Sequence, residues 1–170
     1  LDRYGYAQRA DVFATLIQEF AIAATVEAWL EDFRQRAWVE CQCFPDTHHV
    51  LHTLRQRGCK LGIITNGSSE SQRAKVRAAN LAELVDVILV SAEEAINKPD
   101  PEIFMRAATR LQVLPADCLF VGDNPDADVL GAQAAGMQAV WVKRHLPWPA
   151  TQIQSGHAIG ELIELLTISI

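Results

Sequence analysis

Residues 120–136, FVGDNPDADVLGAQAAG, carry a dense cluster of carboxylates at the point where a strand is expected to join a helix. The apolar run 118–121 is typical of a strand that is buried on both faces. Gly122 then allows a sharp turn without a Cβ penalty. Pro125 suits the first turn of a helix, where its missing N–H costs nothing, and apolar residues continue that helix to the end of the stretch. The stretch therefore predicts a buried strand followed by a helix, with Asp123 at the carboxyl end of the strand.

Three carboxylates lie close together in this stretch, at Asp123, Asp126 and Asp128. Carboxylates at that density repel one another unless a positive charge lies among them, and hard oxygen ligands suit a divalent cation such as Mg²⁺. Helix capping is the alternative, because Asp and Asn are favoured at the start of a helix, and capping alone would account for Asn124 or Asp126. Asp123 follows the strand directly and is the stronger candidate for a metal ligand.

Composition limits the class of protein. The chain has 170 residues, of which 49% are hydrophobic and 21% are charged, and this suits one globular domain with a small accessory lobe. The net charge of -6 and the pI near 5.3 argue against a nucleic-acid surface, which needs clustered Lys and Arg. No apolar run reaches membrane-spanning length, and the first residues lack the layout of a signal peptide, so we expect no membrane partner and a cytoplasmic location. Four unevenly spaced cysteines predict reduced thiols.

The first forty residues differ from the rest of the chain. Apolar residues within 11–20 and within 26–33 fall at helical spacing, which predicts two amphipathic helices. No strand pattern precedes Lys60. We therefore expect a helical lobe over residues 1–43 and an α/β body over residues 44–170.

The body alternates expected strands with expected helices. The strands are 60–64, 85–90, 118–121 and 139–142; the helices are 47–57, 69–79, 101–111, 125–135 and 160–166; and a loop occupies 145–156. This alternation predicts a Rossmann-like α/β fold, with a parallel sheet and helices on both faces.

Polar groups follow three of the expected strands. Thr65, Asn66, Gly67 and Ser68 follow the first, Lys98 lies in the loop beyond the second, and Asp123 follows the third. The carboxyl ends of parallel strands meet at one edge of the sheet, where ligands bind, so a shared site is expected there. Hydroxyl and amide groups near a helix N-terminus grip anionic oxygens, and a lysine adds positive charge. With a metal, this set points to phosphate and to phosphoryl transfer.

Three blocks carry a resemblance to a known family. LGIITNGS (61–68), NKPDPEIF (97–104) and FVGDNPDADVLGAQAAGM (120–137) resemble, in order, the second, third and fourth motifs of the haloacid dehalogenase-like (HAD) hydrolase superfamily. The similarity is close over residues 44–142, and residues 1–20 resemble part of the family's helical cap. The resemblance implies a HAD-like core with a partial cap. It also implies an Mg²⁺-dependent phosphatase that acts on a small phosphomonoester through an aspartyl phosphate.

The resemblance also implies roles for particular residues. Thr65, Asn66, Gly67 and Lys98 would bind the substrate, and Asp123 and Asp128 would form the metal site. Thr65 would hydrogen-bond the phosphoryl group and Lys98 would steady its charge, so these two are the catalytic candidates. Asp123 would bind Mg²⁺, and Asp128 would support the metal or the lysine. Taken singly, Thr65 could instead cap a helix and Lys98 would be an ordinary surface lysine.

One family motif is missing from the chain. These enzymes open with a strand that ends in D-x-D-x-T, whose first Asp attacks phosphorus and whose second serves as acid and base. No such block occurs, since Asp2 and Asp11 lie in helical patterns. Without that strand, the strands around Ile63 and Phe120 would keep unpaired apolar edges. We therefore expect the attacking segment to lie outside this chain, within roughly fifty residues before Leu1 at ordinary element lengths.

Other interpretations stay open. Cys41, Cys43, His48, His49 and His52 lie close in sequence and could hold Zn²⁺, although their spacing fits no common zinc pattern. The favoured interpretation is that the histidines lie on an exposed face of a helix. A 2-haloacid dehalogenase and a catalytically inactive binding protein of the same fold are the alternative functions. The phosphomonoester and the choice between monomer and homodimer are not fixed by the sequence.

Overall fold

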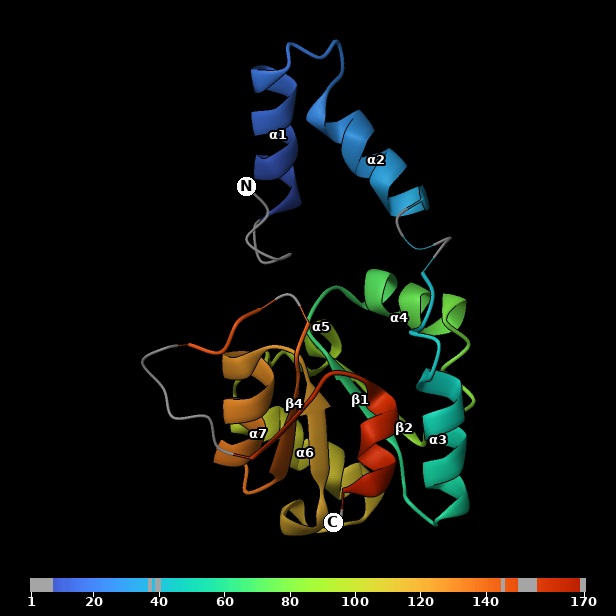
Figure 1. Ribbon diagram of the computed structural model, residues 1–170. Coiled ribbons are helices and arrows are strands. Elements are labelled where there is room, and N and C mark those ends of the chain that lie inside the picture. The colour runs from blue at the N-terminus through green and yellow to red at the C-terminus, as the bar shows by residue number, and fades with distance from the viewer. Residues whose placement is uncertain (1–7, 37, 39–40, 145, 150–155, 169–170) are drawn as a thin grey trace. The chain divides into compact units, whose positions relative to one another are not determined.

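Figure 1 shows the computed structural model of the chain. The structure describes residues 8–36, 38, 41–144, 146–149 and 156–168. The chain divides into two compact units, Leu1–Cys41 and Gln42–Ile170. Among the described residues, no helix is both long enough and apolar enough to cross a bilayer.

The first unit is a pair of helices, α1 (Arg9–Glu19) and α2 (Val26–Arg36), which pack against each other. Their contact is aromatic: the Phe13 ring meets those of Trp29 and Phe33 edge-on, at centroid distances of 5.5 and 5.7 Å. The Trp38 ring packs on Phe33 in the same way, at 5.4 Å. The two helices expected in this region are confirmed, and the half-buried Trp29 and Trp38 take part in the aromatic contact.

The second unit alternates strands and helices, and each strand pair among its described residues is parallel. Its elements are α3 (Thr47–Gln56), β1 (Gly62–Thr65), α4 (Ser69–Ala78), β2 (Val87–Val90), α5 (Ser91–Glu94), α6 (Pro101–Leu111), η2 (Pro115–Asp117), β3 (Leu119–Gly122), η3 (Pro125–Leu130), α7 (Gly131–Ala134), β4 (Gln138–Val142), β5 (His157–Ile159) and η4 (Leu162–Thr167).

β4 is the most buried strand, and the contacts of its side chains show which helices cover each face of its sheet. Its Ala139 and Trp141 belong to a core cluster that also contains residues of α6 and α7. Val140 and Val142 belong to a second cluster, formed with residues of α3 and η4. Because successive residues of a strand point to opposite faces, each face of this sheet is covered by helical structure. The predicted α/β fold with helices on both faces is confirmed.

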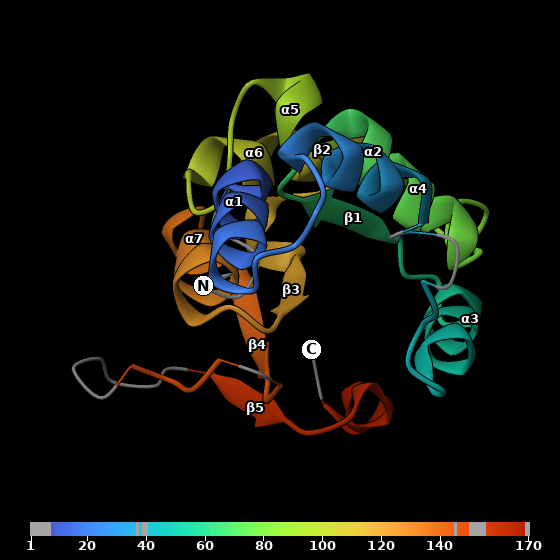
Figure 2. The ribbon, with the colours of Figure 1, turned by 90° about the horizontal axis from the view of Figure 1, so that it is seen from above.

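The strands form two separate hydrogen-bonded sets, β1–β2 and β3–β4–β5. Figure 2 shows the two sets from above. Ile64 of β1 and Phe120 of β3 nevertheless pack against the same core cluster, in which Phe104 of α6 meets Phe120 at a centroid distance of 4.9 Å. Ile63, Ile64 and Phe120 are only half-buried, in contrast to β4. Within the described part of the chain, β1 and β3 therefore each keep one unpaired edge.

Several elements differ from the sequence expectation. The helix expected at 160–166 is a 3₁₀-helix that begins at Leu162, because Glu161 and Glu164 form a capping box there. The helix expected after Asn124 starts as a π-helix, η3, and becomes α-helical only in α7. The short elements α5 and β5 are absent from the sequence prediction. The loop expected at 145–156 lies largely outside the described residues.

Candidate active site

The first component of the site is the turn between β1 and α4. Thr65 ends β1, and its Oγ1 donates a hydrogen bond to Gln72 Oε1 at 2.7 Å. Ser68 caps α4 by accepting from the Ser71 amide at 3.3 Å, so the alternative in which Thr65 caps the helix is wrong. Gly67 has a φ of +141°, and a Cβ at this position would lie 2.5 Å from Gln72 Nε2. The turn thus needs glycine, and it leaves Thr65 at the carboxyl end of its strand.

The second component is Lys98, which the fold ties to this turn. The Lys98 amide donates to Asn66 Oδ1, and Asn66 Nδ2 donates to the Lys98 carbonyl, both at 2.9 Å. The Gly67 amide donates to Ser91 Oγ at 2.9 Å, and Ser91 is buried directly after β2. These bonds join the loops that follow β1 and β2 into one polar unit.

The third component is the pair between Lys98 and Asp128. Lys98 Nζ lies 2.6 Å from Asp128 Oδ1, and the two side chains are only 12% and 7% exposed. The ammonium also lies 5.4 Å from the centroid of the Phe120 ring. The second oxygen, Asp128 Oδ2, accepts from the Asn124 amide at 3.0 Å. Both oxygens of Asp128 are therefore engaged, and of its two expected roles this contact matches support of the lysine.

Gly122 makes the approach of Asp128 possible. A Cβ on Gly122 would lie 2.4 Å from both Cβ and Oδ2 of Asp128, a distance that real Cβ atoms do not reach. Asn124 is the N-cap of η3, and its Oδ1 accepts from the Ala127 amide at 2.8 Å, so the capping role expected for Asn124 is confirmed. Glycine is thus required where the third strand meets the helix that carries Asp128.

Asp123 lies exposed at the carboxyl end of β3. Its backbone carbonyl accepts from Trp141 Nε1 at 3.1 Å, which fixes the residue to the neighbouring strand β4. A magnesium ion is commonly held by one or two carboxylates, with water and phosphate oxygens completing its shell. The exposed carboxylate of Asp123 fits that requirement.

A zinc site is not formed by the residues proposed for it. Among the described residues, no three His, Cys, Asp or Glu side chains gather closely enough to hold a metal. His48, His49 and His52 are exposed on α3, and His48 Nε2 lies 2.9 Å from the Ala79 carbonyl oxygen. Cys43 Sγ donates to that same oxygen at 3.5 Å. The exposed helix face expected for the histidines is confirmed.

Three residues that contact the site residues were not predicted from the sequence. Gln72 holds the Thr65 hydroxyl, Ser91 holds the Gly67 amide, and Trp141 holds the Asp123 carbonyl. Ser91 could have been found, because it is a polar residue directly after an expected strand. Gln72 and Trp141 carry no comparable local signal, since their partners are set by how the helix and the strand pack.

Comparison with known proteins identifies the family. The model of the haloacid dehalogenase-like hydrolases matches residues 1–136. The chain belongs to this family. It is 38% identical to phosphoserine phosphatase of Thermus thermophilus over 122 residues, which are 72% of this chain and 49% of that protein. It is also 34% identical to (S)-2-haloacid dehalogenase 1 of a Pseudomonas species over 130 residues, 76% of this chain and 57% of the relative.

Solved structures give the same result for the fold. The HAD-hydrolase YfnB of Bacillus subtilis, solved with bound magnesium, superposes with a TM-score of 0.82 at 26% sequence identity. The superposition covers 96% of this chain and 74% of YfnB. The chain spans about half the length of the curated relatives that it matches.

Proposed function

We propose that the chain is the part of an Mg²⁺-dependent phosphatase that carries its phosphate-binding and metal-binding residues, and that the enzyme acts on a small phosphomonoester. The observation that carries the proposal is the buried Lys98–Asp128 pair, whose lysine is bonded through its backbone to Asn66, the residue after Thr65. Asp123 lies at the carboxyl end of β3, before the helix that carries Asp128. A fixed cation, a hydroxyl and an exposed carboxylate at one edge suit a phosphoryl group and its counter-ion.

The residues divide the work between binding and charge neutralisation. Thr65, Asn66 and Gly67 form the turn that would hold phosphoryl oxygens. The Thr65 hydroxyl and the Gly67 amide, which donate to Gln72 Oε1 and Ser91 Oγ in the structure, would donate to those oxygens instead when the substrate binds. Lys98 faces the charge that shifts during transfer, and Asp128 keeps its ammonium in place. Pre-organised charge of this kind is worth most in a site with little water.

Asp123 would hold the magnesium ion. When bound, the ion supplies positive charge next to the phosphate oxygens. A relative solved with magnesium, YfnB, supports the choice of metal. Asp128 remains assigned to the same site, with the lysine rather than the metal as its contact.

The attacking carboxylate would come from a strand that fills the space between the free edges of β1 and β3. The support is the unpaired edge that each of these strands keeps within the described residues, together with the absence of a D-x-D-x-T block from the sequence. Its aspartate would bond to phosphorus as the ester oxygen leaves, and water would then release phosphate. The chain of 170 residues by itself should therefore release no phosphate.

The substrate class follows from the relatives and is the less specific part of the proposal. The similarity to phosphoserine phosphatase supports a small phosphorylated metabolite as substrate, with phosphoglycolate-like acids, sugar phosphates and nucleoside monophosphates as the candidates.

A cytoplasmic location is supported by the free thiols of Cys41, Cys43, Cys59 and Cys118. A monomer and a homodimer both suit the proposal.

A haloacid dehalogenase is the second candidate, because one relative carries that name. The test uses the natural gene product that contains this chain, assayed for phosphate release from p-nitrophenyl phosphate with Mg²⁺ and for chloride release from 2-chloropropionate. We expect phosphate release only. Chloride release without phosphate release would establish the dehalogenase, and neither release would establish a binding protein.

A further inference from the structure

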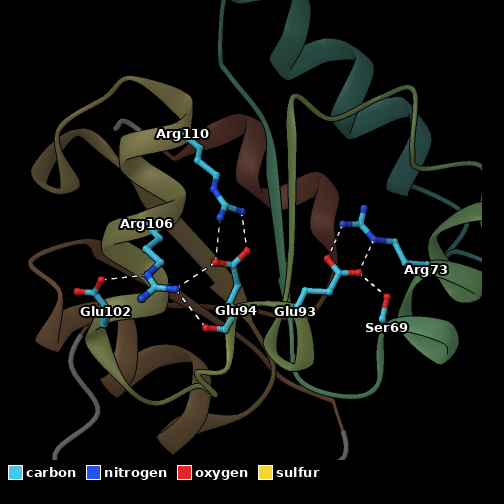
Figure 3. A network of polar contacts seen from close by, with 7 residues as sticks. All are labelled: Ser69, Arg73, Glu93, Glu94, Glu102, Arg106 and Arg110. Carbon is cyan, nitrogen blue, oxygen red and sulfur yellow. Dashed lines mark hydrogen bonds and ion pairs between the residues drawn. The ribbon is translucent and has the colours of Figure 1, made fainter.

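The short helix α5 carries two adjacent glutamates whose side chains meet residues of different helices (Figure 3). Glu93 turns toward α4, where it accepts from the Ser69 hydroxyl and from Arg73 Nε and Nη2, the last two at 3.0 and 2.7 Å. These bonds to Arg73 and Ser69 lower the pKa of Glu93 to about 2. Glu93 is therefore an anion at neutral pH, and it holds α4 at two points, Ser69 in the first turn and Arg73 in the second.

Glu94 turns toward α6. Its two oxygens accept from Arg110 Nη1 and Nη2 at 2.7 and 2.9 Å, and Arg106 Nη1 lies 3.3 Å from Oε2. Arg106 also donates to the Glu94 carbonyl oxygen at 3.2 Å. The Glu94 side chain is only 8% exposed, whereas Arg110 and Arg106 are 48% and 38% exposed, so the bidentate pair has a buried carboxylate and partly solvent-screened guanidinium groups.

Each helix that α5 holds leads to one residue of the candidate site. The first turn of α4 carries Gln72, whose amide binds the Thr65 hydroxyl. α6 begins at Pro101, three residues after Lys98, with Asp100 as its N-cap. α5 itself is bonded to the turn after β1, through Ser91 and the Gly67 amide. One four-residue helix therefore connects the supports of the two groups that would contact the phosphoryl group.

We propose that Glu93 and Glu94 are positioning residues that fix the distance between Thr65 and Lys98. Neither residue touches the substrate, and the proposal rests on the phosphatase function proposed above. Glu93 acts through Ser69 and Arg73 on the turn that carries Gln72. Glu94 acts through Arg106 and Arg110, in the middle and the last turn of α6, on the helix that begins three residues after Lys98. A shift of about 1 Å in a group that contacts the reacting atoms is enough to slow a reaction severely.

The test compares Glu93→Gln and Glu94→Gln with Glu102→Gln in the natural gene product. Glu102 is a matched control, because it also pairs with Arg106, at 3.0 Å, but it lies on α6 and not on α5. We expect each α5 variant to lower kcat for p-nitrophenyl phosphate at least fivefold, with KM changed less than twofold. We expect Glu102→Gln to leave both constants within twofold. Exchanging the partners, as Glu93→Arg with Arg73→Glu, should restore most of the lost rate.

Amide hydrogen exchange provides a readout that needs no activity. The reporters are the amides of Gly67 and Lys98, which are bonded to Ser91 Oγ and Asn66 Oδ1. We expect faster exchange at Gly67 in Glu93→Gln and at Lys98 in Glu94→Gln, by about threefold to tenfold, with β4 amides unchanged. The positioning role would be overturned if both α5 variants matched Glu102→Gln in their amide exchange rates and in their kinetic constants. If the protein hydrolyses no phosphomonoester, the exchange rates alone decide, so failure of the phosphatase proposal is recognised separately.

Discussion

Lys98 and Asp128 are separated by 30 residues in sequence and by 2.6 Å between their charged atoms. The sequence predicted both as site residues, Lys98 from its place in the loop beyond an expected strand and Asp128 from the carboxylate cluster and the family resemblance. The family resemblance left open whether Asp128 supports the metal or the lysine, because its contact depends on how far η3 brings Asp128 back over Gly122. The contact of Thr65 with Gln72 depends on packing in the same way. The local sequence predicts which residue types form the site and roughly where they lie, whereas the contacts between them depend on how the elements pack.

Lys98 gives the first test at this scale. We expect Lys98→Ala to lower kcat more than it raises KM, because its charge matters most where negative charge shifts during transfer. Steady-state kinetics with p-nitrophenyl phosphate measure both constants. An effect on KM alone would make Lys98 a clamp for the bound substrate instead of a catalytic residue.

Gly122 gives a test of the fold at the same site. A methyl group here would lie 2.4 Å from Asp128, so Gly122→Ala must displace Asp128 from Lys98 or shift the strand. We expect a loss of about 1–3 kcal/mol in the free energy of unfolding, as for other overpacked sites, measured by urea denaturation. Gly160→Ala is the control, because its nearest neighbour would lie 3.6 Å away. Equal stabilities of the two variants would contradict the close approach.

At the scale of elements, the sequence predicted the longer helices and missed the short pieces. α6 was predicted with its observed bounds, Pro101–Leu111, because proline and aspartate mark its start and its buried face is regular. α5 has four residues and β5 has three, too few for a periodic pattern to develop. The spacing of apolar residues likewise does not predict the π-helical turn of η3, although such turns are frequent at functional sites.

α5 has a consequence for stability that depends on pH. Arg73 and Ser69 depress the pKa of Glu93 from its ordinary 4.5 to about 2. A depressed folded-state pKa stabilises the protein above the ordinary value, and this stabilisation is lost as the pH falls through the folded-state value. We expect Glu93→Gln to be less stable than the wild type at pH 7, with the difference narrowing as the pH falls from 4.5 toward about 2.

Urea unfolding at a series of pH values checks this expectation. Glu70→Gln, a substitution of an exposed residue in the first turn of α4, serves as the control. We expect the control to follow the wild-type curve more closely than Glu93→Gln does. A wild-type and a Glu93→Gln curve that stay parallel below pH 4.5 would show that the contacts of Glu93 do not contribute.

At the scale of the whole molecule, the two strand sets share one core without hydrogen bonds between them in the described chain. The sequence anticipated this arrangement, because the family resemblance placed a further strand between those around Ile63 and Phe120. The half-buried residues of β1 and β3 agree with it. What the sequence could not supply is the geometry of the site, since the three loops that form it are far apart in the chain.

The most direct test of the account is the Mg²⁺ dependence of phosphate release by the natural gene product, wild type against Asp123→Asn. We expect saturable activation by Mg²⁺, and an increase of at least tenfold in the half-activating concentration when the carboxylate of Asp123 is replaced by a neutral amide. Unfolding curves of the two proteins serve to confirm that both are folded. Phosphate release that needs no Mg²⁺, or an unchanged Mg²⁺ requirement in Asp123→Asn, would contradict the assignment of this edge of the sheet as the site of a magnesium-dependent phosphatase.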